Sequence, residues 1–237
     1  MLASIESNLR SVHERISDAA ARSGRNPDQI RLVAISKSQP AEAVRAAYTL
    51  GLREFGENRV QEGLEKQADL SDLPDLQWHM VGHIQSRKAR DVPAHFDLVH
   101  SVDRLKIARL LDQQAGADEL NLPVFLECNV SGEGSKYGWD MSEEMRWDAT
   151  GEELRKLSGF GNLEIRGLMT MAPWVDDEQV VRATFAKLRG LRDFLQEKLA
   201  FSLPELSMGM TDDFELAIEE GATVVRIGRA IFGPRTG

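Results

Sequence analysis

The lysine at position 37 stands where it could act as a nucleophile. Residues 32–37 read LVAISK, and Pro40 follows three residues later. The apolar run has the composition of a buried strand, and Pro40 suits the first turn of a following helix. Because strand side chains alternate, Lys37 shares a face with Val33 and Ile35. If that face lines a barrel, burial favours the neutral amine, which can form an imine. Most lysines at strand ends are solvated, so position alone does not decide.

Two glycine-containing segments near the end of the chain could bind a phosphate. Residues 207–211 read SMGMT after one expected strand, and residues 226–233 read RIGRAIFG after the next. Glycine lets the backbone approach a ligand closely, and hydroxyl groups and helix N-termini supply hydrogen-bond donors. In α/β barrels the loops after the last two strands frequently form a phosphate site. Either segment alone is weak evidence, because glycines after strands are usually turns.

A lysine that forms an imine and a phosphate site at one barrel mouth would suit two kinds of chemistry. One is the binding of pyridoxal 5′-phosphate through its aldehyde. The other is a Schiff-base aldolase that acts on a sugar phosphate. The residues themselves leave both open.

The elements that must position these residues alternate along the chain. An amphipathic helix is expected first, with apolar residues at positions 2, 5, 9, 12 and 16. Eight strand-like runs then alternate with helical patterns, which predicts a parallel sheet. We therefore expect a single (β/α)8 TIM barrel over residues 1–237 with an extra N-terminal helix, and an open doubly wound sheet is the alternative.

The boundaries of these elements follow from the apolar runs and their periodicity. The longest irregular stretch is Asn129–Asp148. The expected strands are Leu32–Ser36, Glu54–Phe55, Leu76–His79, Leu98–His100, Pro123–Asn129, Leu163–Leu168, Glu205–Met208 and Thr223–Ile227. The expected helices between them are Ala41–Leu50, Asn58–Ala68, Asp103–Ala115, Glu143–Leu157, Asp177–Leu199 and Asp212–Glu220.

The composition argues against several classes of function. The chain has 237 residues and a formal net charge of −9. An acidic chain without a run of Lys or Arg is a poor candidate to bind nucleic acid or an anionic membrane. No apolar stretch is long enough for a membrane span, and the N-terminus lacks the apolar core of a signal peptide. The single cysteine, Cys128, forms no internal disulfide, so a cytoplasmic location is expected. His79 and His83 lack the glutamate of an HExxH motif, so no metal is expected.

Seven segments in a fixed order resemble the pyridoxal phosphate homeostasis protein family, also called the proline synthase co-transcribed homologue family. That family is similar to the barrel domain of bacterial alanine racemase. The segments run over almost the whole chain: LVAISK (32–37), FGENRVQE (55–62), WHMVGHIQSRK (78–88), ECNVSGEGSKYG (127–138), GLMTMAP (167–173), SMGMTDDFELAI (207–218) and VRIGRAIFG (225–233).

The resemblance implies a pyridoxal 5′-phosphate site within these segments. Lys37 would form the imine, Asn58 would lie near the ring, and Arg226 would face the pyridine nitrogen. The phosphate would be held by Ser207 and by the backbone around Met208, Gly209 and Gly228. The assigned cofactor-binding residues are Lys37, Asn58, Ser207, Met208, Gly209, Thr211, Arg226, Gly228 and Arg229.

This chain departs from the family pattern at two of these positions. Position 211 is often Ser and is Thr here, so its hydroxyl is kept. Position 229 is often Ser or Thr and is Arg here, so a side-chain hydroxyl contact to the phosphate is missing. If Arg229 turned inward, it would supply a charge-assisted contact instead.

The resemblance also bears on catalysis. Arginine stays protonated and can only donate, so Arg226 would leave the ring nitrogen unprotonated and the ring a weak electron sink. A racemase also needs a second base, which in alanine racemases is a tyrosine supplied with the help of a β-rich second domain. The chain ends at Gly237, so we expect no such domain, and its only tyrosines are Tyr48 and Tyr137. No catalytic residue is therefore assigned.

The expected function is that of a pyridoxal 5′-phosphate-binding protein rather than an enzyme. The resemblance implies a role in vitamin B6 and amino-acid homeostasis, in which the protein stores, buffers or delivers the cofactor. The alternatives are an amino-acid racemase dependent on the same cofactor and, less favoured, a Schiff-base aldolase. The expected partners are the cofactor and, transiently, apo-enzymes that receive it, with no nucleic acid or membrane. A cytoplasmic monomer is expected.

Overall fold

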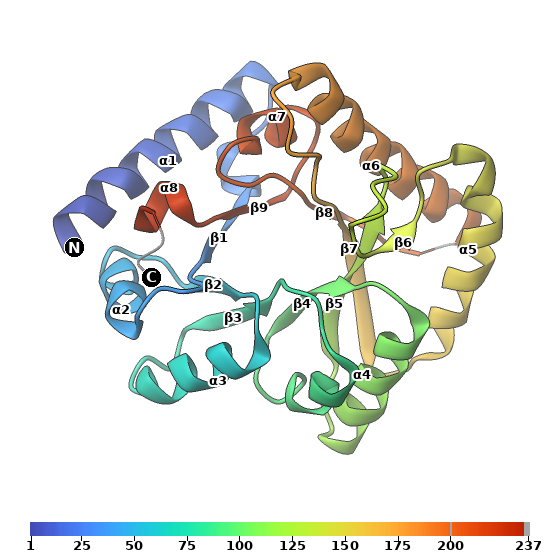
Figure 1. Cartoon of the computed structure of the whole chain (residues 1–237), viewed down its shortest axis with the longest axis horizontal. Coiled ribbons are helices and arrows are strands. Elements are labelled where there is room, and N and C mark those ends of the chain that lie inside the picture. Colours follow the sequence, from blue (N-terminus) through green and yellow to red (C-terminus); the bar gives the residue numbers. More distant parts are fainter. Residues whose placement is uncertain (200, 235–237) are drawn as a thin grey trace.

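In the computed structural model, which describes residues 1–199 and 201–234, the strands form a closed parallel barrel (Figure 1). The order around the ring is β4-β3-β2-β1-β9-β8-β7-β5, and β4 also pairs with β5. That last pairing closes the sheet, so the predicted barrel is confirmed and the open sheet is excluded. The strands are β1 (Arg31–Ile35), β2 (Glu54–Glu57), β3 (Gln77–Met80), β4 (Leu98–Val102), β5 (Leu122–Asn129), β6 (Trp139–Asp140), β7 (Leu163–Met169), β8 (Glu205–Ser207) and β9 (Val224–Ile227).

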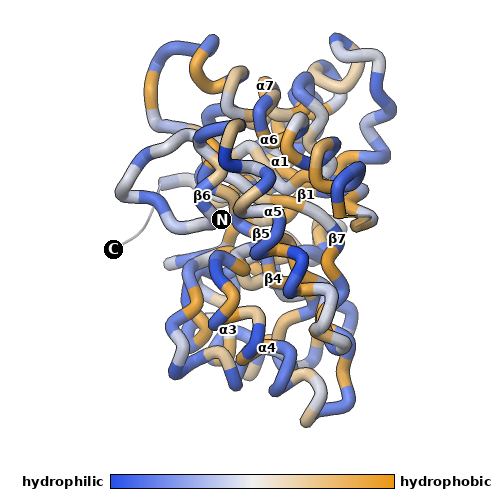
Figure 2. The backbone as a smooth tube through the Cα atoms, turned by 90° about the vertical axis from the view of Figure 1, so that its right-hand side faces the viewer, coloured by the Kyte–Doolittle hydropathy of each residue, from blue (hydrophilic) through white to orange (hydrophobic). Residues whose placement is uncertain are grey.

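Helices surround the barrel on its outside (Figure 1). Their turns alternate between hydrophilic and hydrophobic stretches along the tube in Figure 2, as expected of helices that bury one face. Among the described residues, none of them has both the length and the apolar composition of a membrane span. The helices are α1 (Leu2–Arg22), α2 (Ala41–Thr49), α3 (Val60–Asp69), α4 (Leu105–Ala117), α5 (Trp147–Arg155), α6 (Glu178–Leu199), α7 (Phe214–Glu219) and α8 (Arg229–Phe232).

Helix α1 is the expected extra helix, and it packs beside α7, α8 and α2. Ile5, Leu9, Val12 and Ile16 are buried, as their spacing predicts. Leu2 is 49% exposed, because it lies in the first turn of the helix, where fewer neighbours cover it. The apolar face therefore begins one turn later than the sequence pattern indicates.

The structure differs from the expected elements in the crossover between β5 and β7. The expected helix Glu143–Leu157 is divided into a 3-10 turn at Glu144–Arg146, then α5, then a second 3-10 turn at Lys156–Gly159. The 3-10 turns adjoin α5 at both ends, so the first and last residues of the expected helix wind more tightly than an α-helix, as is common at helix ends. In the long loop before it, β6 pairs in parallel with β5, an element the sequence did not predict.

The barrel interior follows the alternation of the strands. Val33 packs with Leu98, Phe125, Met169 and Val224 in an apolar layer inside the ring, separate from the larger core outside it. At the amino-terminal end of the strands the interior is polar. Arg31 pairs there with Glu54 and Glu205 at 2.9 and 2.8 Å. The carboxyl ends of the strands form the opposite end, or mouth, of the barrel.

Candidate functional site

A cavity of about 620 Å³ opens at the barrel mouth beside β1, β8 and β9. Its volume is in the range, roughly 300–1,000 Å³, that small-molecule sites occupy. Five predicted site residues line it: Lys37, Thr211, Arg226, Gly228 and Arg229. A second cavity of about 780 Å³ adjoins it and shares Trp174, Asp212 and Arg229 with it, but it does not reach Lys37 or Arg226.

Lys37 lies in a tight turn directly after β1. The Gln39 amide donates to the Ser36 carbonyl at 3.0 Å and closes this turn. Ser38 has a φ of 59°, which ends the extended backbone, so the strand stops two residues before Lys37 rather than at it. Lys37 is half-buried and lines the cavity from this turn.

A buried ion-pair cluster holds the Lys37 turn from the outside of the barrel. Lys66 of α3 donates to the Ser36 carbonyl and to the carboxylates of Glu57 and Glu62. Glu62 also accepts the Ser38 amide hydrogen. Burial raises the pKa of Glu57, against the opposing effect of hydrogen bonds from Lys66 and Ser36. The strand end and the turn are therefore tied to α3, which limits movement of the Lys37 backbone.

Arg226 projects inward from β9 and is only 5% exposed. Its Nη1 donates to Ser207 Oγ at 2.6 Å, and its Nη2 donates to the Thr170 carbonyl at 2.9 Å. Burial lowers the pKa of Arg226 to about 10, while the carboxylates of Asp213 and Glu127 act in the opposite direction. The guanidinium therefore remains a positively charged donor near neutral pH, fixed at two of its nitrogens.

Ser207, Met208 and Gly209 are not among the residues that line the cavity. Ser207 and Met208 are fully buried, and the Ser207 hydroxyl is engaged by Arg226 and, at 2.8 Å, by His100 Nδ1. Gly209 has a φ of +94°, and an added Cβ would lie 2.6 Å from the Cβ of Ala217, so only glycine fits there. A phosphate contact for these residues stays a prediction.

Asn58 follows β2, outside the helix in which the sequence analysis put it, because α3 begins at Val60. Alternation places it on the inward face with Glu54 and Gly56, and it is half-buried. It is not among the residues that line the cavity with Lys37.

Glu127 and His100 are inward residues at the site that the sequence analysis did not assign. Glu127 is 4% exposed, and burial, together with the Asp103 carboxylate, raises its pKa to about 7, whereas Arg226 acts to lower it. Each lies two residues after an apolar residue of the inner layer, Phe125 or Leu98. The two-residue spacing from an inward apolar residue was the sequence signal that could have identified Glu127 and His100 as inward residues.

Tyr137 does not line the Lys37 cavity and is 56% exposed. Its ring stacks on His83 with centroids 3.8 Å apart, and His83 Nδ1 lies 2.9 Å from an Asp103 carboxylate oxygen. Within residues 1–199 and 201–234, no group of three or more His, Cys, Asp or Glu side chains is arranged to hold a metal ion.

This combination of a parallel barrel and a mouth lined by lysine and arginine defines a class of protein. Residues 2–236 match the family model described as "Alanine racemase, N-terminal domain". The alanine racemase of Corynebacterium glutamicum shares the fold with a TM-score of 0.71 at 15% identity, over 100% of this chain and 62% of that chain. At that identity the likeness shows the fold alone.

Sequence identity is much higher with a narrower group of proteins than with this racemase. A Pseudomonas aeruginosa protein named pyridoxal phosphate homeostasis protein is 48% identical over 234 residues, covering 99% of this chain and 97% of the relative. The Escherichia coli K12 protein of the same name is 41% identical, covering 98% and 97%. The chain belongs to the pyridoxal phosphate homeostasis protein family, as the seven segments predicted. PipY of Synechococcus elongatus PCC7942, solved with PLP bound, has a TM-score of 0.83 at 41% identity, over 97% of this chain and 100% of that chain.

Proposed function

We propose that this chain binds pyridoxal 5′-phosphate in the mouth cavity, covalently through Lys37, and stores, buffers or delivers it without catalytic turnover. The observation that carries the proposal is that Lys37, Arg226 and Gly228 line one cavity of about 620 Å³. The names of the relatives and the PLP-bound PipY structure support the same ligand.

The residues of the cavity fit the chemistry of this cofactor. When bound, pyridoxal 5′-phosphate supplies an aldehyde that bonds to an amine and a pyridine ring that withdraws electrons. Lys37 offers the amine, and Arg226 offers a donor that suits the ring nitrogen. Gly228 lines the cavity, and an added Cβ would lie 3.0 Å from the Ile35 carbonyl oxygen, so glycine allows the backbone to pass this close to the end of β1. The Thr211 hydroxyl lies 3.4 Å from the Ala230 amide and adds a polar group for a phosphate.

Arg226 and Tyr137 support a carrier rather than a racemase. A guanidinium that only donates leaves the ring nitrogen unprotonated, which weakens electron withdrawal. Tyr137, the candidate for a second base, is stacked on His83 outside the Lys37 cavity. The proposal also includes a single domain, a cytoplasmic monomer, and transient contact with apo-enzymes but not with nucleic acid or membrane. The net charge of −9 supports the exclusion of polyanions.

The loaded protein should not exchange the α-hydrogen of amino acids above the rate of free cofactor. Loss of a well-placed general base typically lowers a rate by about 10² to 10⁴, and the weak electron withdrawal adds to that loss. The measurement is incubation with single L-amino acids in deuterated water, following α-deuteration and the D-isomer. The same sample should be yellow, whereas a Schiff-base aldolase would stay colourless.

Two variants complete that experiment. Exchange that depends on the protein and disappears in both Lys37→Ala and Tyr137→Phe would replace the carrier by the racemase. Tyr48→Phe is the matched control, because Tyr48 is hydrogen-bonded to Asp75 on the outside of the barrel.

Removal of Arg229 should weaken cofactor binding only modestly. Its Nη2 is paired with Asp212 at 2.6 Å, and the side chains are 59% and 61% exposed. A solvated charge already neutralised by a partner contributes little, so Arg229→Ala should raise the Kd by about tenfold or less. The measurement is titration of cofactor-free protein, with Arg155→Ala, which breaks an exposed pair with Glu152, as the control. Complete loss of binding in Arg229→Ala would show that Arg229 turns inward to the phosphate.

A further inference from the structure

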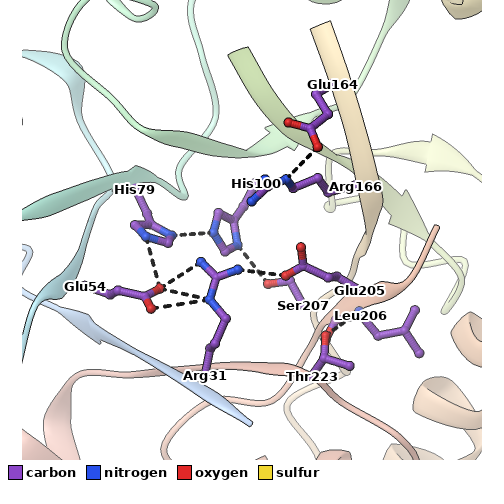
Figure 3. Close-up of polar contacts among 10 residues, drawn as sticks. All are labelled: Arg31, Glu54, His79, His100, Glu164, Arg166, Glu205, Leu206, Ser207 and Thr223. Carbon is purple, nitrogen blue, oxygen red and sulfur yellow. Dashed lines mark hydrogen bonds and ion pairs between the residues drawn. The ribbon is translucent and has the colours of Figure 1, made fainter. Parts of the chain in front are cut away.

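A line of side-chain contacts crosses the barrel interior from Arg226 to Glu54. Arg226 Nη1 lies 2.6 Å from Ser207 Oγ, and Ser207 Oγ lies 2.8 Å from His100 Nδ1. His100 Nε2 then lies 2.9 Å from His79 Nδ1, and His79 Nε2 lies 3.3 Å from Glu54 Oε2. Figure 3 shows the part from Ser207 to Glu54, with the side chains pointing toward one another across the barrel.

The members of this line come from different strands, and most are excluded from solvent. Ser207 and His100 are fully buried, His79 is 1% exposed and Arg226 is 5% exposed. Glu54 stands at the amino-terminal end of β2, where it is paired with Arg31. Buried polar atoms need partners, and here each one finds its partner on a neighbouring or facing strand.

The two ends decide the direction of the hydrogen bonds. Arginine can only donate, so Ser207 Oγ accepts from Arg226, and its own hydrogen is then available to His100 Nδ1. That leaves the hydrogen of His100 on Nε2, where it meets His79 Nδ1. The hydrogen of His79 is then on Nε2 and faces the Glu54 carboxylate.

The opposite direction conflicts with both ends. With the hydrogens on Nδ1, the bare Nε2 of His79 would face the carboxylate of Glu54. The Ser207 hydroxyl would accept two hydrogen bonds and its hydrogen would lose His100 as acceptor. Burial lowers the pKa of His79 to about 3 and that of His100 well below its usual value, so each ring carries a single hydrogen near neutral pH.

We propose that Glu54, His79, His100 and Ser207 are positioning residues that orient the Arg226 guanidinium through a hydrogen-bond chain with one direction. This hydrogen-bond chain holds Arg226 against the ring nitrogen of the bound cofactor and thereby tunes how strongly the ring withdraws electrons. The contact between Arg226 and the cofactor rests on the proposed function, whereas the direction of the hydrogen bonds depends on no ligand.

Loss of a middle member would release one side of the guanidinium. Without His100, the Ser207 hydroxyl loses the acceptor that points its lone pair at Arg226. The contact of Nη2 with the Thr170 carbonyl, at 2.9 Å, would be unaffected, whereas Nη1 would face a Ser207 hydroxyl that is free to rotate. A change far from the mouth would therefore alter a group at the cofactor.

The first test is the tautomer of each histidine in the cofactor-free protein, read by ¹⁵N NMR of histidine-labelled samples. His79 and His100 should both carry their hydrogen on Nε2. A hydrogen on Nδ1 of either ring, or a charged ring near neutral pH, would overturn the proposal.

Substitution of two comparable glutamates, Glu54 and Glu205, makes that test more specific. Glu54→Gln should disturb the tautomers of both rings, because an amide can turn its NH₂ toward His79. Glu205→Gln removes a carboxylate that pairs with the same Arg31 but is not in contact with His79, and it should leave them unchanged. Equal effects of the two substitutions on the histidine tautomers, or no effect of Glu54→Gln, would show that Glu54 does not set the direction of the hydrogen bonds.

The second test uses the loaded protein. His100→Leu interrupts the hydrogen-bond chain. It should raise the cofactor Kd by about fivefold to tenfold, which is the effect of one hydrogen bond. It should also shift the visible absorbance of the bound cofactor. His100→Gln can accept from Ser207 and donate to His79, so it should retain the original spectrum. An unchanged spectrum and Kd in His100→Leu would overturn the positioning role. Failure of the wild-type protein to bind any cofactor would instead reject the proposed function and leave the NMR result intact.

Discussion

Replacement of Lys37 by alanine should abolish the covalent attachment of pyridoxal 5′-phosphate. Among the described residues, Lys37 is the only lysine that lines the mouth cavity. Its turn is anchored through Lys66 and Glu62 of α3, which holds the Lys37 backbone beside the cavity. After borohydride reduction and proteolysis, mass spectrometry should find the cofactor on the Lys37 peptide of the wild-type protein and on no peptide of Lys37→Ala.

The controls are two other lysines, each beside an acidic residue. Lys136 donates to the Met171 carbonyl at 3.0 Å and lies beside Glu133, and Lys88 lies 3.6 Å from Asp91. Lys136→Ala and Lys88→Ala should keep the label on Lys37. A label that persists in Lys37→Ala, or that maps to Lys136 in the wild-type protein, would contradict the assignment.

A valine in place of Gly228 should weaken cofactor binding by about tenfold to a hundredfold. The added Cβ would lie 3.0 Å from the Ile35 carbonyl oxygen and 3.3 Å from the Ile35 Cβ. Either the backbone of β9 moves outward or the valine methyl groups enter the cavity. Overpacking of this kind typically costs about 1–3 kcal/mol, and each 1.4 kcal/mol changes a Kd by about tenfold. Titration of cofactor-free protein measures the effect.

Gly159→Val is the matched control for this substitution. An added Cβ at Gly159 meets nothing within 4 Å, and the residue lies in a 3-10 turn away from the mouth. Its Kd should equal that of the wild-type protein. Wild-type affinity in a folded Gly228→Val would mean that the cofactor does not approach the backbone at this position.

Alternation along the strands predicted much of the site correctly. Because side chains of a strand alternate between its faces, the apolar run before Lys37 predicted that Val33 and Ile35 face the interior, and the structure confirms this. The same rule would have placed Glu127 and His100 inside the barrel, yet the sequence analysis assigned neither. Each reads on its own as an isolated polar residue in an apolar run, with no partner visible nearby in the chain.

The irregular segments were predicted less well. The expected helix over Glu143–Leu157 is three pieces, and β6 lies in a stretch expected to be an irregular loop. Both are held by side-chain hydrogen bonds to the backbone. Trp147 donates from its indole nitrogen to the Met141 carbonyl, six residues before it, and Trp139 donates to the Val102 carbonyl, 37 residues before it. Such contacts leave no periodic pattern in the local sequence.

The sequence by itself determined the alternation of eight strands with helices, the inward face of the strand before Lys37 and the glycines at the mouth. These features depend on local periodicity and backbone freedom. Tertiary structure decided which inward residues meet. Strand register sets the height of each side chain in the barrel, and it places Val33 beside Arg226 and Ser207 beside Val224. The contact between Ser207 and His100 joins residues 107 positions apart in the chain. It exists because closing the ring brings β4 and β8 to opposite sides of one narrow interior, where buried polar atoms can only satisfy one another.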